Sequence, residues 1–251
     1  MDIKIYENRQ LMGAKAAREV ANQLRELLYI YEEVNVIFAA APSQNEMLEA
    51  LCRSAGISWN RINAFHMDEY IGLANNMPQC FGKFLEDRLF AKLPFKSVHY
   101  INGNAASLVE ECERYSRLLV TFPPHIVCMG IGENGHIAFN DPHVADFNDP
   151  RTIKVVTLDL ACRQQQINDG CFDTIDQVPT HALTLTIPAL LNASTIYCVV
   201  PGYNKAQAVY NTIHRNITEM HPATSLRKHP NTILFLDKNS SSLLNKNREQ
   251  K

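Results

Sequence analysis

Short apolar runs alternate with longer segments of helical periodicity along almost the whole chain. Four of these runs, NVIFAAA, HIVCMGIG, TIYCVVPG and NTILFLD, lack regular alternation of apolar and polar residues. Strands that are buried on both faces have this composition, and such strands build parallel sheets. The chain is therefore predicted to be an α/β protein with a Rossmann-like three-layer fold, in which helices cover a mostly parallel central sheet.

The predicted elements follow one another without an internal repeat or a linker rich in Pro, Gly or Ser, which favours one domain over residues 1–251. Residues 238–251 are polar and are expected to form a flexible tail. The predicted strands are 34–40, 62–67, 98–101, 126–131, 153–158, 183–187, 195–200 and 232–237. The predicted helices are 10–31, 44–54, 80–92, 105–121, 159–168 and 205–219. Ligands of open α/β sheets bind beyond the carboxyl ends of the strands, so functional residues are expected there.

Charge and hydropathy exclude several classes of protein. The 24 basic and 26 acidic residues leave a formal net charge of -2, which supplies no field for holding a nucleic-acid backbone. No window approaches the ~20 apolar residues of a membrane span, and the opening residues MDIKIYENRQ lack the apolar core of a signal peptide. A cytoplasmic location is therefore predicted, with neither nucleic acid nor membrane as a partner.

The 7 cysteines are scattered through the chain and never stand in a C-x-x-C pair. An odd, scattered set argues against both a disulfide framework and a zinc site. No cysteine has an adjacent histidine, which is the kind of partner that a nucleophilic thiol needs. No metal is predicted, and most thiols are expected to pack as small apolar groups.

The strand predicted at 62–67 leads into FHMDEYIGL, where Asp68 and Glu69 follow the apolar residues directly. Two carboxylates would then lie at the rim of the ligand crevice. A solvated turn is one interpretation of such a pair. A general base is the other, because a partly buried carboxylate has its pKa raised into a useful range.

A second strand end reads VCMGIGENGHIAFNDP and holds three of the 10 glycines, Gly130, Gly132 and Gly135. Glycine lets the backbone turn sharply and come close to a ligand. The third glycine falls one residue too early for the G-x-G-x-x-G pattern of dinucleotide sites. His136 follows directly, and Asp141 lies five residues later. A histidine titrates near neutrality and can move a proton when another group orients its ring.

Two further strand ends lead into helices. In VVPGYNKAQAV, Lys205 falls in the first turn of the predicted helix, where a cation is unfavourable unless an anion shares the site. In IFAAAPSQNEMLEAL, Ser43 follows Pro42 at the junction. Ser43 either caps the helix and does nothing more, or it holds a phosphate together with the free amides around it.

These four stretches, in this order, resemble the glucosamine-6-phosphate deaminase (isomerase) family, which shares its fold with the 6-phosphogluconolactonases. FHMDEYIGL is similar to the family's F-N-M-D-E-Y-x-G-L, and GIGENGHIAFNDP is similar to its G-x-G-x-[DN]-G-H-I-A-F-N-E-P. Two later blocks, HALTLTIPALLNASTIYCVVPGYNKAQAV and PATSLRKHP, extend the resemblance to about residues 34–237. It implies conversion of glucosamine 6-phosphate, or an epimer, and water to a ketose 6-phosphate and ammonia. The implied route is ring opening and an enolamine, with no metal or redox cofactor.

The resemblance also implies roles for individual residues. Asp68 is expected to shuttle a proton between C2 and C1 of the open-chain amino sugar. His136 is expected to open the ring, with the side chains of Asn134 and Asp141 orienting it. Gly132 and the neighbouring glycines are expected to clear backbone space so that the sugar can lie against His136.

The 6-phosphate is expected at Lys205 and at the turn around Ser43. Gln166 falls where some family members place a phosphate-binding Arg, and Arg163, one helical turn earlier, is the candidate substitute. A small amino sugar phosphate is thus the predicted partner. The oligomeric state stays open, because family members range from monomers to hexamers, and a homo-oligomer is one alternative.

Three departures from the family's pattern concern the site. Asn134 stands where some members have Asp, Asp141 is one methylene shorter than the usual Glu, and the phosphate loop reads AAAPSQ instead of a T-G-G-T type sequence. A 6-phosphogluconolactonase is the alternative enzyme, although lactonases typically read G-H-T-A-S where this chain reads G-H-I-A-F. A sugar-phosphate sensor without catalysis is the alternative outside enzymes.

Overall fold

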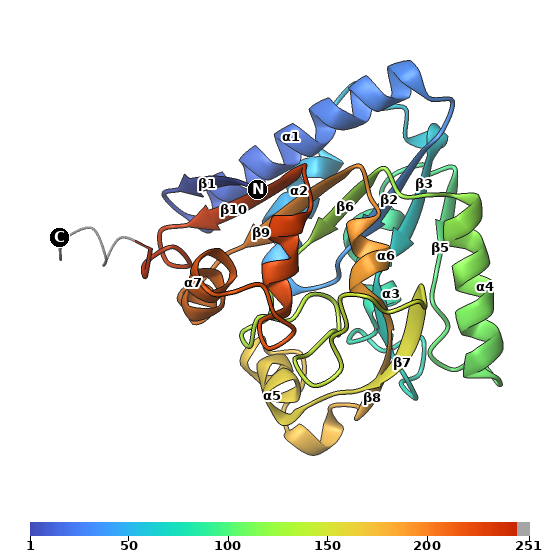
Figure 1. Cartoon of the computed structure of the whole chain (residues 1–251). Helices are drawn as coiled ribbons and strands as arrows, with labels where there is room; N and C mark the ends of the chain where they lie inside the picture. The colour runs from blue at the N-terminus through green and yellow to red at the C-terminus, as the bar shows by residue number, and fades with distance from the viewer. Residues whose placement is uncertain (245–251) are drawn as a thin grey trace.

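A seven-stranded parallel sheet runs through the middle of the molecule in the computed structural model, which describes residues 1–244 (Figure 1). The strand order is β1-β10-β9-β6-β2-β3-β5, and every neighbouring pair is parallel. The strands are β1 (Asp2–Tyr6), β10 (Thr232–Asp237), β9 (Thr195–Val200), β6 (Ile126–Met129), β2 (Val34–Phe38), β3 (Ile62–His66) and β5 (Ser97–His99). The predicted parallel sheet is confirmed.

The central strands bury both of their faces, because successive side chains of a strand point to opposite sides. Along β2, Val36 and Phe38 belong to one apolar cluster and Ile37 to the other. The first cluster packs under α1 (Arg9–Ile30), α2 (Asn45–Cys52) and α3 (Phe81–Leu85), and the second under α4 (Leu108–Thr121), α6 (Ile187–Leu191) and α7 (Ala206–His214). The predicted three layers are therefore present. Within residues 1–244, no helix has the length and apolar character to cross a membrane.

A second, three-stranded sheet lies apart from the central one, with α5 (Leu160–Asn168) beside it at the bottom of the view (Figure 1). It is antiparallel, in the order β4 (Asp68–Tyr70), β8 (His181–Leu185) and β7 (Ile153–Thr157). The sequence predicts strands at 153–158 and 183–187 but assigns them to no separate sheet. The chain enters this sheet directly after β3, so Asp68 begins a short strand rather than a loop.

The order of the central strands reverses between β2 and β6. From β2 the chain continues to β3 and β5 on one side, whereas β6 is followed by β9 and β10 on the other. The crossover connections therefore diverge at this point, and a crevice opens above the carboxyl ends of the strands.

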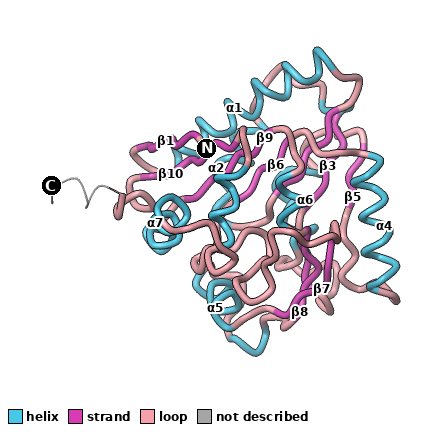
Figure 2. Tube along the Cα trace, viewed as in Figure 1, coloured by secondary structure: helices cyan, strands magenta, loops and turns pink. Residues whose placement is uncertain are grey.

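The predicted elements are present with shifted ends, and two strands were not predicted. These are β4 and β1, an exposed edge strand that pairs with β10 (Figure 2). Residues 186–187, predicted as strand, begin α6 instead, because Thr186 caps that helix by accepting from Ala189 N. The predicted helix at 80–92 forms as α3 followed by a π-helical turn at Glu86–Phe90.

The flexible tail predicted from residue 238 is wrong for its first part. Ser240 and Ser241 are buried, and the backbone N of Leu244 donates to Ser241 O. The Asp237 carboxylate accepts a hydrogen bond from Ser240 N, which continues the packed structure beyond β10. Residues 245–251 lie outside the described part of the chain.

Candidate active site

One pocket lies at the carboxyl ends of four adjacent central strands. Its space, with the open mouth included, is about 540 Å³. The residues that line it after these strands are Ala39, Ala40, Ala41 and Ser43 (β2), Met67 and Asp68 (β3), Gly130, Ile131 and Gly132 (β6), and Lys205 (β9). All four strand ends singled out in the sequence therefore meet at one place.

Asp68 lines this pocket as the first residue of β4, and only 6% of it is exposed. Within residues 1–244 its carboxylate has no hydrogen-bond or ion-pair partner. Burial, together with the nearby charge of Glu69, raises the pKa of Asp68 well above its usual value. The solvated-turn interpretation of Asp68 is wrong.

Glu69 does not line the pocket, and its carboxylate binds backbone amides instead. Its two carboxylate oxygens accept hydrogen bonds from the amides of Tyr70, Phe81 and Gly82 at 2.8 to 3.0 Å. Two of these amides belong to the first residues of α3, which have no partners inside the helix. The prediction that both carboxylates lie at the crevice rim is therefore correct for Asp68 and wrong for Glu69.

The imidazole of His136 is held by a carboxylate. His136 Nδ1 lies 2.9 Å from Asp141 Oδ1, and Asn134 Nδ2 donates to the same oxygen at 2.9 Å. Asn134 Oδ1 also accepts from the backbone N of His136 at 3.0 Å. Asp141 therefore reaches the ring despite its short side chain, whereas Asn134 acts on the backbone of His136 and on Asp141, not on the ring.

The pKa of Asp141 is lowered overall, in contrast to that of Asp68. Burial raises it, but the charge of His136 at 2.9 Å, the hydrogen bond from Asn134 and the nearby Cys162 thiol outweigh burial. The carboxylate therefore stays ionised beside the imidazole. A carboxylate on Nδ1 fixes the tautomer and the orientation of the ring.

Gly132 makes room for the imidazole itself. A Cβ built on Gly132 would lie 2.3 to 2.5 Å from three atoms of the His136 ring. The turn is closed by Gly132 N, which donates to His136 O at 2.8 Å, and by Gly135 at φ +88°. The glycines thus allow the His136 ring to pack closely against the strand end. From the sequence they were expected to clear space for the ligand, but beside Gly132 the histidine itself occupies that space.

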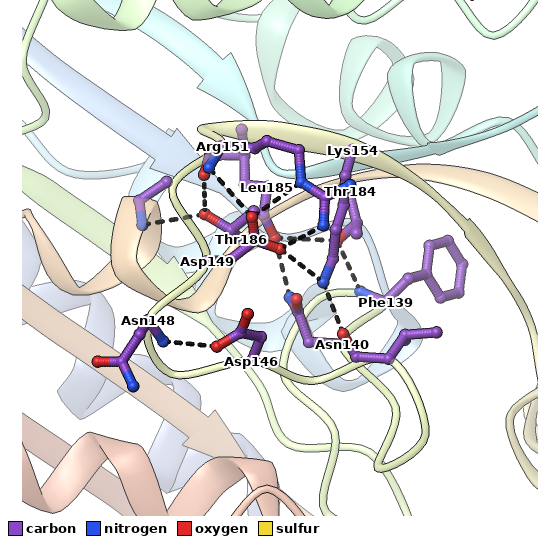
Figure 3. Close-up of polar contacts among 12 residues, drawn as sticks. Phe139, Asn140, Asp146, Asn148, Asp149, Arg151, Lys154, Thr184, Leu185 and Thr186 are labelled. Carbon is purple, nitrogen blue, oxygen red and sulfur yellow. Dashed lines mark hydrogen bonds and ion pairs between the residues drawn. The ribbon is translucent and has the colours of Figure 1, made fainter.

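Buried polar contacts anchor the loop that carries Asp141 (Figure 3). Asn140 Nδ2 donates to Leu185 O at 2.8 Å, and Phe139 N donates to Thr184 Oγ1 at 3.0 Å. Further along, Lys154 Nζ donates to Val144 O at 2.6 Å and pairs with Asp149 at 3.0 Å. The loop is therefore attached to β8 and β7, which keeps Asp141 in register with His136.

Lys205 and Ser43 face the pocket from neighbouring strand ends. Lys205 is only 4% exposed, and within residues 1–244 its ammonium group has no ion-pair or hydrogen-bond partner. Burial lowers the pKa of its ammonium group. Ser43 lies in a 3-10 turn, where its side chain caps no helix and accepts from Gln44 Nε2 at 3.1 Å. A buried, unpaired cation facing a cavity favours an anionic ligand.

The two phosphate candidates on α5 differ in position. Gln166 lines the pocket, as do Gln165 and Asp169, which the sequence reasoning did not single out. Arg163 does not line it, because its guanidinium donates to the carbonyls of Ile175 and Val178. The proposed substitution of Arg163 for a phosphate-binding Arg is therefore not supported by its position.

Cys162 lies beside the His136–Asp141 pair and was not predicted as a site residue from the sequence. His136 Nδ1, Asp141 and Cys162 Sγ offer three possible metal-ligating atoms within 4.8 Å of one another. Burial raises the pKa of the Cys162 thiol well above its usual value, so the thiol stays protonated. A metal here would have to replace the contact between His136 and Asp141. No local pattern joins these residues, because Cys162 comes from α5.

The chain is similar to known proteins along most of its length. The family model for glucosamine-6-phosphate isomerases/6-phosphogluconolactonase matches residues 7–235. A glucosamine-6-phosphate deaminase of Listeria monocytogenes is 35% identical over 97% of this chain and 100% of its own length. One of Bacillus cereus is 34% identical over 90% of this chain and 84% of its own.

The fold has solved counterparts in the same group of proteins. A monomeric glucosamine-6-phosphate deaminase superimposes with a TM-score of 0.88 at 30% identity, covering 97% of this chain and 100% of that one. A 6-phosphogluconolactonase of Thermotoga maritima gives 0.77 at 19% identity, covering 94% and 99%, and shares the fold. The chain belongs to the glucosamine-6-phosphate isomerase/6-phosphogluconolactonase family.

Proposed function

We propose that the protein is an amino-sugar-phosphate deaminase/isomerase that converts glucosamine 6-phosphate and water to fructose 6-phosphate and ammonia. The observation that carries this proposal is the pairing of two opposite acid–base environments in one pocket. Among residues 1–244 no group donates to the buried carboxylate of Asp68, whereas the imidazole of His136 is paired with the ionised Asp141. Identity of 34–35% to named deaminases supports the same reaction.

Each group has a distinct part in this reaction. With a proton on Nδ1 directed at Asp141, His136 can exchange a second proton at Nε2 with the ring oxygen and so open the sugar. The Asp68 carboxylate then removes the proton from C2 while His136 Nε2 gives its proton to the C1 oxygen, so the carbonyl becomes a hydroxyl and an enolamine forms. Return of the Asp68 proton to C1 yields the protonated ketose imine. Water adds to the imine carbon and returns a proton to His136, and ammonia leaves.

Lys205 supplies the charge for the phosphate. Its ammonium group is buried and unpaired, and a dianionic phosphate would form charge-assisted hydrogen bonds with it. Ser43 and the amide of Gln166 line the same pocket and can donate to phosphate or sugar oxygens. Lys205, Ser43 and Gln166 are therefore proposed to bind the substrate.

Purified protein tests the function directly. With glucosamine 6-phosphate we expect equal release of ammonia and fructose 6-phosphate. Parallel assays use galactosamine 6-phosphate, the epimer, and 6-phosphogluconolactone, the substrate of the alternative enzyme. Lactone hydrolysis above the spontaneous rate without ammonia release would favour the lactonase. Binding of the amino sugar phosphate without turnover would identify a sensor.

A further inference from the structure

His66 is a buried histidine whose two ring nitrogens are both engaged directly beside Asp68. It ends β3 and is 0% exposed. Its Nδ1 lies 2.9 Å from Asp68 O, and its Nε2 accepts a hydrogen bond from Ile101 N at 2.8 Å. Because a backbone amide can only donate, Nε2 has to be unprotonated. Nδ1 therefore carries the hydrogen and donates it to the carbonyl of Asp68.

The neutral ring is the stable form here. Burial lowers the pKa of His66 to about 4. The backbone around the ring is also held in place, since Tyr115 Oη donates to His66 O at 2.7 Å and accepts from His66 N at 3.1 Å. His66 therefore has a defined tautomer and little freedom to turn.

The contacts of His66 join β4 to one of the two segments that flank it. On one edge, β4 pairs with β8 through Asp68 and Thr184. On the other, the segment after Ile101 packs closely enough that a Cβ on Gly103 would lie 1.9 Å from Tyr70 O. The imidazole of His66 bonds to Ile101 at the start of this segment and to Asp68 at the start of β4. The His66 ring therefore sets the distance between β4, which carries the Asp68 carboxylate, and the segment that begins at Ile101.

From this geometry we infer that His66 is a positioning residue for Asp68, acting through the Asp68 carbonyl and the Ile101 amide. The expected change in kcat rests on the proposed function. The effect of His66 on the position of the Asp68 carboxylate does not. A shift of about 1 Å in a reacting group costs on the order of 100-fold in rate, so loss of these two bonds should be visible in kcat.

His229 provides a matched control. It is also buried, at 5% exposure, and its ring nitrogens contact Thr232 Oγ1 at 3.1 Å and Ala193 O at 2.8 Å. It lies at the amino ends of β9 and β10, opposite to the pocket. His229 Nδ1 also accepts from Asn231 N at 3.3 Å. His66→Phe and His229→Phe therefore each remove a carbonyl partner and an amide partner from a buried ring, and only His66 contacts the Asp68 backbone.

The kinetic arm compares these variants with glucosamine 6-phosphate deuterated at C2. We expect His66→Phe to lower kcat about 100-fold with KM changed less than about 3-fold. Its C2 isotope effect should rise, because proton transfer becomes slower relative to the other steps. His229→Phe should keep the wild-type kcat and isotope effect. His66→Asn, whose amide retains a donor and an acceptor, should recover most of the rate and also serves if the Phe variant does not fold.

An arm that needs no activity follows the Asp68 carboxyl by carbon-13 NMR, with the resonance assigned by its loss in Asp68→Asn. His66→Phe or His66→Asn should move the titration midpoint of Asp68 toward the ordinary aspartate value, and more so for Phe. His229→Phe should leave it unchanged.

A folded His66 variant with wild-type kcat and an unchanged Asp68 titration would overturn the inference. Wild-type protein without ammonia release would refute the proposed function, while the NMR arm still decides the role of His66.

Discussion

Two buried aspartates beside one pocket have opposite acid–base properties. Asp68 lies on a short strand, its carboxylate has no donor in the described part of the chain, and its pKa is raised. Asp141 lies on an irregular loop with His136 and Asn134 around it, and its pKa is lowered. Burial acts in the same direction on both, so the number of donors and cations around each carboxylate decides the difference. One residue type can therefore supply both a proton acceptor and a fixed negative charge.

The largest effect is expected from Asp68→Asn. An amide has nearly the shape of the carboxylate but cannot take a proton, so we expect kcat for ammonia release to fall about 10³- to 10⁴-fold. Substrate affinity, measured by calorimetry, should change little. Retention of wild-type kcat would show that another group acts as the base.

Asp141→Asn should have the next largest effect. The amide still fits beside Asn134, but it no longer provides a negative charge for the imidazole. We expect kcat to fall about 100-fold, mainly through the ring-opening step. A substrate analogue locked in the open-chain form provides the control, because its conversion bypasses that step and should be much less affected. Equal losses with both substrates would refute the assignment of Asp141 to ring opening.

Lys205→Met leaves both aspartates intact and should separate binding from proton transfer. Removal of a charge-assisted contact to phosphate should raise KM about 10- to 100-fold, with a smaller change in kcat. Inhibition by inorganic phosphate should weaken in parallel. A variant whose KM is unchanged would show that the phosphate lies elsewhere in the pocket.

The smallest effect concerns stability as a function of pH. The pKa of Asp68 is raised on folding, so its contribution is fully present below the unfolded value of about 3.9 and is lost as pH rises toward the folded value. Asp68→Asn should therefore gain stability relative to wild type as pH rises over this range. The pKa of Asp141 is lowered, so its contribution is present above about 3.9 and is lost as pH falls through the folded value.

Urea unfolding from pH 3 to pH 8 measures both variants. The stability difference between Asp68→Asn and wild type should grow as pH rises. The loss of stability in Asp141→Asn should shrink as pH falls below about 4. If the stability difference from wild type changes with pH in the same way for both variants, the pKa values of the two carboxylates are not shifted in opposite directions.

Residues next to strand ends were the most predictable part of the site. Asp68, His136, Ser43 and Lys205 follow apolar runs directly, and parallel strands bring their carboxyl ends to one edge. The contacts that the neighbouring side chains make were less predictable. Glu69 bonds to amides 12 and 13 positions away in sequence, Arg163 bonds to carbonyls beyond α5, and Cys162 reaches Asp141 from another element. Such partners are set by packing between elements, which no local pattern encodes.

The sequence by itself determined the layered α/β fold, the location of the pocket and the residues at its strand ends, because burial on both faces leaves a compositional pattern along each strand. Only the tertiary structure decided the pKa shifts of Asp68 and Asp141. It separated β4, β8 and β7 into their own sheet, left Asp68 without donors among residues 1–244 and placed Asn134 and His136 around Asp141. A pKa depends on neighbours within a few ångströms, and those neighbours come from distant parts of the chain.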